Sequence, residues 1–126
     1  MNTIIKNAAL LKQIVFIDLS YNKLGIAGTE IICQYMAEYN CGLEHINLEG
    51  NNLGNNNAKK IIVAIYENLD SKIRYLNLGQ NMLNDDISAE LTILIQKSEY
   101  LTVVILYQNQ FRNQGAGLMM SEIKKH

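Results

Sequence analysis

Apolar residues recur along the chain in a spacing that appears four times. The stretch 43–53 shows it in full: Leu43, Ile46 and Leu48 alternate with polar residues, an asparagine follows, and Leu53 closes the motif. The same order of residue types begins again at Ile14, Ile73 and Leu101. Alternation over a few residues is typical of a short, half-buried strand. A fixed period of about 30 residues indicates a repeat architecture.

A helix is predicted after each strand, because a second apolar stripe stays in register with the first. The residues ten and fourteen positions after each turn asparagine are apolar, which places them on one helix face. They are Ile32, Met36, Ile61, Ile65, Leu91, Ile95, Met119 and Ile123. The first of these helices is expected to begin at Gly28 or Thr29 and to run through Tyr39. Asp85 or Asp86 is expected to cap the third helix, where a negative charge suits the N-terminus.

An asparagine occupies the same turn position in every repeat. The four are Asn22, Asn51, Asn81 and Asn109, separated by 29, 30 and 28 residues. An amide side chain both donates and accepts, so it can satisfy backbone groups in the sharp turn between strand and helix. Stacked repeats would place the four amides in a ladder. We therefore interpret these asparagines as structural.

The chain is predicted to form one continuous domain over residues 1–126. It contains no proline and no linker rich in glycine and serine. Residues 3–12 have the pattern of an amphipathic helix, which is expected to cover the first repeat, with a frayed tail as the alternative. The repeats are expected at about 14–42, 43–72, 73–100 and 101–126.

These motifs resemble the leucine-rich repeat family, and the long period with a full helix resembles its ribonuclease-inhibitor-like subclass. The resemblance implies an α/β fold: a right-handed solenoid, or horseshoe segment, with a parallel sheet on the concave face and helices outside. It also implies that the concave face binds a protein partner. Asn57 and Ile87 depart from the pattern, because they stand where Gly28, Gly115 and the subclass often have glycine. The loops around these two residues are therefore expected to be less regular.

The strand residues between the core positions are expected on the concave face, because strand side chains alternate. Neighbouring strands would arrange them in three rows. The rows are Phe16, His45, Tyr75 and Val103; then Asp18, Asn47, Asn77 and Ile105; then Ser20, Glu49, Gly79 and Tyr107. Exposed aromatic residues beside polar groups are common anchors of protein interfaces. We interpret this face as the partner-binding site, although the same rows could serve only to stabilise the sheet.

The last strand, residues 101–107, is apolar on both faces. Its inward residues would be Leu101, Val104 and Leu106, and its outward residues Val103, Ile105 and Tyr107. Unpaired backbone groups beside an apolar face invite a further chain. The sequence leaves three interpretations open: a homodimer formed through this edge strand, a partner docked there, or a chain cut from a longer array.

Composition narrows the classes of function. Hydrophobic residues at 48% and charged residues at 18% fit a folded chain. A net charge of −1 provides no field that would attract nucleic acid or an anionic membrane. No apolar run approaches the roughly 20 residues of a membrane-spanning helix, and the first residues lack a secretory signal.

A cytoplasmic location is expected, with the two cysteines, Cys33 and Cys41, reduced. The bias towards asparagine, isoleucine and lysine suggests an AT-rich coding genome. It therefore prompts a second hypothesis, a secreted bacterial effector that acts in the host cytosol.

Candidates for catalysis or metal binding are few. His45 is the only internal histidine, and an open sheet face offers no pocket that excludes water from a general base. Cys33, Cys41 and His45 lack the spacing and the fourth ligand of a zinc site. The sequence therefore predicts no enzyme, no metal and no cofactor. It favours a non-enzymatic protein–protein interaction module, with a self-associating structural repeat protein, or a regulator of an enzyme such as a small GTPase, as alternatives.

Overall fold

The computed structural model of the protein describes residues 12–39 and 42–112. In this part of the chain, short strands form a single 4-stranded parallel sheet whose order follows the chain. The strands are β1 (Phe16–Asp18), β2 (His45–Asn47), β3 (Tyr75–Asn77) and β4 (Val103–Ile105). Parallel neighbours require a crossover between each strand and the next.

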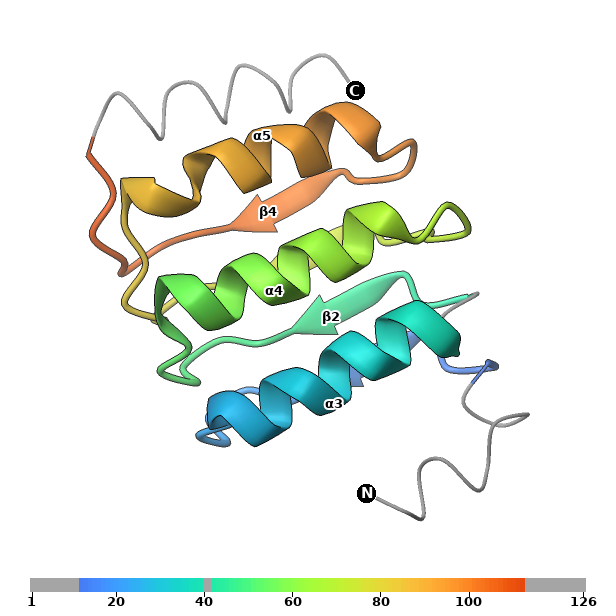
Figure 1. Ribbon diagram of the computed structural model, residues 1–126, viewed down its shortest axis with the longest axis horizontal. Coiled ribbons are helices and arrows are strands. Elements are labelled where there is room, and N and C mark those ends of the chain that lie inside the picture. The colour runs from blue at the N-terminus through green and yellow to red at the C-terminus, as the bar shows by residue number, and fades with distance from the viewer. Residues whose placement is uncertain (1–11, 40–41, 113–126) are drawn as a thin grey trace.

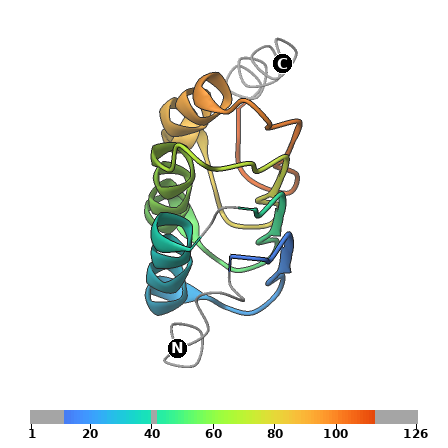
Figure 2. The same cartoon turned by 90° about the vertical axis from the view of Figure 1, so that its right-hand side faces the viewer.

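Each crossover between these strands contains a helix. The helices are α3 (Gly25–Glu38), α4 (Gly54–Glu67) and α5 (Ser88–Lys97), and the 3-10 turn η1 (Asp85–Ile87) directly precedes α5. Neighbouring helices pack side by side (Figure 1), and Figure 2 shows them as one layer with the strands as a second layer. The predicted α/β fold with a parallel sheet is confirmed. We call the sheet face that points away from the helices the open face.

The hydrophobic core lies between the two layers. The apolar residues in β2 and β3, and those just before and after these strands, are buried as expected from the sequence: Leu43, Ile46, Leu48, Ile73, Leu76 and Leu78. The helix stripe that packs on them is buried as well: Ile32, Met36, Ile61, Ile65, Leu91 and Ile95. Full burial of one such side chain contributes about 1.5–3 kcal/mol. The outer strands are less well covered, since Ile17 of β1 and Val104 of β4 are only half-buried.

The turn asparagines link each turn to the next. Oδ1 of Asn51 accepts a hydrogen bond from the backbone N–H of Asn22 at 2.9 Å, and Oδ1 of Asn81 accepts from that of Asn51 at 3.0 Å. Oδ1 of Asn109 accepts from the N–H of Asn81 at 2.9 Å. The Nδ2 groups of the last three donate to backbone carbonyls of their own turn and of the turn before. The result is a continuous ladder of amides along one edge of the fold.

The first helix begins earlier than the sequence pattern indicated. Helix α3 begins at Gly25 instead of Gly28 or Thr29, because the N–H of Gly28 already donates to the carbonyl of Leu24 at 2.9 Å. Gly25 itself has a φ of +60°, a left-handed conformation that glycine adopts without strain. Helix α4 runs without interruption through Asn57, so the loop expected to be irregular there is regular.

The predicted cap of the third helix is wrong. Helix α5 follows Ile87 and has no side-chain cap, whereas the preceding turn, η1, is capped by Asn84, whose Oδ1 accepts from the N–H of Asp86 at 2.9 Å. Asn84 is extended and stands just outside the helical turn, which is the geometry a capping side chain needs. The carboxylate of Asp85 instead accepts a hydrogen bond from the N–H of Arg112 at 3.0 Å.

Some of the predicted elements lie outside the described residues. These are residues 3–11 of the N-terminal helix and the whole fourth helix with Met119 and Ile123, while Lys12 lies in a turn. None of the helices within 12–39 and 42–112 is long and apolar enough to cross a membrane.

Candidate partner-binding surface

Strand pairing aligns the side chains of the open face in rows. Phe16 pairs with His45, His45 with Tyr75, and Tyr75 with Val103. The second row, two residues further along each strand, is Asp18, Asn47, Asn77 and Ile105. This is the alignment expected from the sequence, so the candidate site residues from four separate repeats do lie together.

The first row forms an aromatic stack, which we call the aromatic strip (Phe16, His45 and Tyr75). The ring centroids of Phe16 and His45 are 4.2 Å apart at an interplanar angle of 34°, and those of His45 and Tyr75 are 3.9 Å apart at 19°. Phe16 is 55% exposed, and the other two rings are half-buried. Stacking of this kind stabilises the sheet and fixes the orientation of each ring.

In the second row, Asp18 and Asn47 accept hydrogen bonds from residues of the turns that follow their strands. Oδ1 of Asp18 accepts hydrogen bonds from the hydroxyl of Ser20 at 2.7 Å and from its backbone N–H at 2.9 Å. These two bonds lower the pKa of the Asp18 carboxyl, and the nearby His45 adds to the effect. Asn47 accepts in the same way from the N–H of Glu49 at 3.0 Å. Much of the polar capacity of this row is therefore used inside the protein.

Asn77 requires a correction. The sequence places it among the exposed residues, but it is only 5% exposed. Its Oδ1 accepts a hydrogen bond from the N–H of Gly79 at 2.9 Å, and the ring of Tyr107 lies over the same glycine. Asn77 consequently supports the turn and offers little surface to a partner.

Two tyrosine rings pack on the backbone of neighbouring turns. Tyr107 belongs to the third row, and Tyr21 lies one residue beyond that row. A Cβ built at Gly79 would be 2.5 Å from Cε1 of Tyr107, and one built at Gly50 would be 2.4 Å from Cε1 of Tyr21. The hydroxyl of Tyr21 accepts a hydrogen bond from Nε2 of Gln80 at 3.0 Å. Each ring thus occupies the space of a missing side chain in an adjacent repeat.

Tyr21 is a surface residue that the sequence pattern did not single out. A signal was present nevertheless: a tyrosine in one repeat aligns with a glycine in the adjacent repeat, as Tyr21 does with Gly50 and Tyr107 with Gly79. The sequence also gave no indication of two separate features in the region before β3. There Leu69 is 96% exposed, and the guanidinium of Arg74 lies 5.4 Å from the ring centroid of Tyr100.

The edge strand β4 presents apolar side chains to solvent. Val103 is 39% exposed and Tyr107 is 48% exposed, while Ile105 is half-buried. Among the residues that the structure describes, strand β4 pairs with β3 on one side and stands at the end of the sheet.

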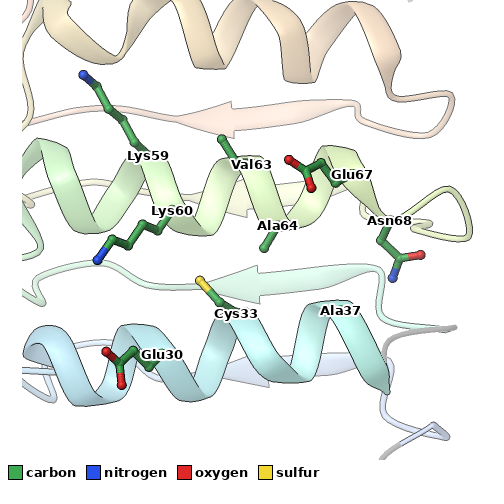
Figure 3. A pocket seen from close by; sticks show the side chains of 9 residues that line it. All are labelled: Glu30, Cys33, Ala37, Lys59, Lys60, Val63, Ala64, Glu67 and Asn68. Carbon is green, nitrogen blue, oxygen red and sulfur yellow. The ribbon is translucent and has the colours of Figure 1, made fainter.

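The helix layer has a groove of its own. It lies between α3 and α4, has a volume of about 680 Å³, and is lined by Cys33 and Glu30 of α3 and by Lys60 of α4, among others (Figure 3). Burial raises the pKa of this thiol, and Lys60 partly opposes the rise. Cys41, the other cysteine, lies outside the described residues. Within the described ranges, no group of three or more histidine, cysteine and acidic residues could hold a metal ion.

Comparison of the chain with protein-family models and with curated proteins gives no match.

Proposed function

We propose that this protein is a non-enzymatic interaction module that binds a protein partner on the open face of its sheet. We also propose that it is a leucine-rich repeat protein of the ribonuclease-inhibitor-like subclass. In that case its strand–turn–helix units form a right-handed solenoid, and the open face is the concave side. The fixed spacing of the turn asparagines and their amide ladder support this proposal.

The aromatic strip is the observation that carries the functional proposal. Its residues alternate along the strands with the core residues Ile17, Ile46 and Leu76, which places the rings on the open face, and Phe16 is more than half exposed. Stacking already fixes the three rings, so little conformational freedom is lost when a partner packs on them. Aromatic side chains are enriched at protein interfaces, and tyrosine is among the residues that most often supply binding energy there.

The surroundings of His45 favour binding over catalysis. Its imidazole ring is held between two aromatic rings on an open face. A general base needs a partner that orients it and a pocket that excludes water, and a face of this kind provides neither.

The proposal is tested by removing the strip without disturbing the core. In a pull-down with quantitative mass spectrometry, the wild type should retain a specific protein that the Phe16→Ala/Tyr75→Ala variant loses. The matched control is Ile26→Ala/Leu69→Ala, which removes two apolar side chains that are 66% and 96% exposed elsewhere. Binding of the same proteins by all three chains, or of none by the wild type, would contradict the proposal.

A second function is favoured by the edge strand: self-association through residues 101–107. Val103 and Tyr107 are exposed beside the edge of a sheet, where another strand can add. Light scattering over a range of protein concentrations tests this. A dimer that dissociates on Ile105→Lys is the expected result, and a monomer at every concentration would exclude it.

A further inference from the structure

Glu49 is a neighbour of two glycines, Gly50 along the chain and Gly79 across the sheet, and each glycine is covered by a tyrosine ring. It directly precedes Gly50, which lies under the ring of Tyr21. Its neighbour across the sheet is Gly79, whose carbonyl accepts the N–H of Gly50 at 3.0 Å and which lies under the ring of Tyr107. Glu49 is therefore next to one ring-covered glycine along the chain and aligned with another across the sheet.

One carboxylate oxygen of Glu49 lacks a donor. Its Oε1 exposes less than 1 Å² and has no hydrogen-bond partner. A polar atom shielded from water without a partner is energetically unfavourable, and the penalty is larger for an ionised group. Glu49 as a whole is only half-buried, so a cationic donor that approaches its carboxylate from solvent can offset this penalty.

The nearby donors are already engaged elsewhere. The hydroxyl of Ser20 donates to Asp18 at 2.7 Å, and the side-chain amide of Gln80 donates to Tyr21 at 3.0 Å. Asp18 contributes a second negative charge to the same face, and the hydrogen bonds that lower its pKa keep it ionised. These two groups therefore do not satisfy Glu49, and a donor on a partner can.

We propose that Glu49, Tyr21 and Tyr107 form a subsite for the side chain of a lysine or arginine on the protein partner. This inference rests on the proposed function, because it names the chemistry of one contact on the open face. The ammonium or guanidinium group bonds to the carboxylate, and the aromatic rings stabilise the cation through their π faces.

The position of the subsite relative to the aromatic strip restricts the partner further. Glu49 is four residues beyond His45 on the same strand path, which corresponds to about 13 Å at roughly 3.3 Å per residue. An extended segment that lies along the strands reaches both sites when a basic residue and an apolar residue are four positions apart.

Selection of random peptides displayed on phage tests the proposal even though the partner is unidentified. Three targets are used: the wild type, the isosteric variant Glu49→Gln, and Phe16→Ala/Tyr75→Ala. Peptides enriched on the wild type should contain a lysine or arginine four positions from an apolar residue. Selection on Glu49→Gln should lose the basic residue and keep the apolar one.

The outcomes separate the two proposals. Peptides that depend on Phe16 and Tyr75 but show no basic preference, or the same preference on Glu49→Gln, overturn the subsite and leave the open face as the binding surface. A wild type that enriches no peptide beyond the Phe16→Ala/Tyr75→Ala variant overturns both.

A double-mutant cycle with one selected peptide measures the contact itself. Glu49→Gln should weaken binding about tenfold, and so should acetylation of the peptide lysine or replacement of its arginine by citrulline. The two changes together should weaken binding no more than either alone. Additive losses would show that the basic residue binds elsewhere and would overturn the assignment. Thermal unfolding of Glu49→Gln checks that the variant is folded.

Discussion

The ring of Tyr21 lies against Gly50, in the space that a side chain at position 50 would fill. A Cβ there would be 2.4 Å from both Cδ1 and Cε1 of the ring. Gly50 has a φ of +69°, but residues at the same turn position adopt similar values, 57° at Tyr21 and 52° at Gln80. The backbone conformation alone therefore does not require glycine at this position, whereas the tyrosine ring does.

Substitution of Gly50 should reveal this dependence. Gly50→Ala is expected to cost about 2–3 kcal/mol of unfolding free energy, because the ring must leave its contact in addition to the left-handed strain of alanine. In a Tyr21→Ala background the same substitution should cost about 1 kcal/mol, which is the backbone contribution alone. Urea denaturation of the four proteins measures both values, and an equal cost in the two backgrounds would show that the ring contact is unimportant.

The asparagine ladder should be strongest at its buried rungs. Asn81 is fully buried; its Oδ1 accepts from the N–H groups of Asn51 and Leu53, and its Nδ2 donates to two backbone carbonyls. Asn81→Ala would leave these groups buried without partners, so we expect a loss of about 3 kcal/mol or more in urea denaturation.

The matched control for this prediction is Asn22→Ala at the first rung. Asn22 is exposed, and its side chain donates to the carbonyl of Ser20 at 3.0 Å. Water can replace that bond, so the loss should be within about 0.5 kcal/mol. Similar losses at the two positions would contradict a ladder whose strength depends on burial.

The lowered pKa of Asp18 predicts a pH-dependent contribution of Ser20. Because the pKa is lower in the folded state, the stabilising interaction is present above the pKa of the unfolded chain and is lost as the pH falls through the folded value. Ser20→Ala removes the largest cause, the hydroxyl bond, so the Asp18 pKa should rise towards its usual range. An NMR titration of the carboxyl carbon measures this shift. The stability difference between wild type and Ser20→Ala should vanish in acid, and a difference that persists there would assign it to another cause.

Cys33 should react slowly with alkylating reagents. Burial raises its pKa, Lys60 lowers it and Glu30 raises it, so the thiolate fraction depends on all three. In a Cys41→Ser background, Lys60→Gln should slow alkylation by iodoacetamide at a fixed pH below the thiol pKa, and Glu30→Gln should accelerate it. The pH profile of the rate gives the pKa directly, and the same direction of change in both variants would contradict this electrostatic account.

The layers of the fold were predictable because a fixed period imposes the same strand register on every repeat. That register by itself aligns Phe16, His45 and Tyr75. The period does not determine how far a long side chain reaches. Tyr21 and Tyr107 cross to the neighbouring turn, and the burial of Asn77 beside Gly79 depends on that reach. The role of Asn84 was missed because a separate 3-10 turn precedes α5: Asn84 caps that turn, and Asp85 and Asp86 lie inside it.

The amide ladder also bears on how such a chain changes in evolution. Each rung after the first accepts a hydrogen bond from the turn before it, at separations of 29, 30 and 28 residues, and donates to carbonyl groups of its own turn and of the turn before. A gene duplication that inserts one whole unit therefore brings its own rung and leaves its neighbours satisfied, whereas an insertion of half a unit orphans two of them. Lengthening by complete units is therefore the least disruptive change for this chain, and each added unit contributes one more strand to the open face.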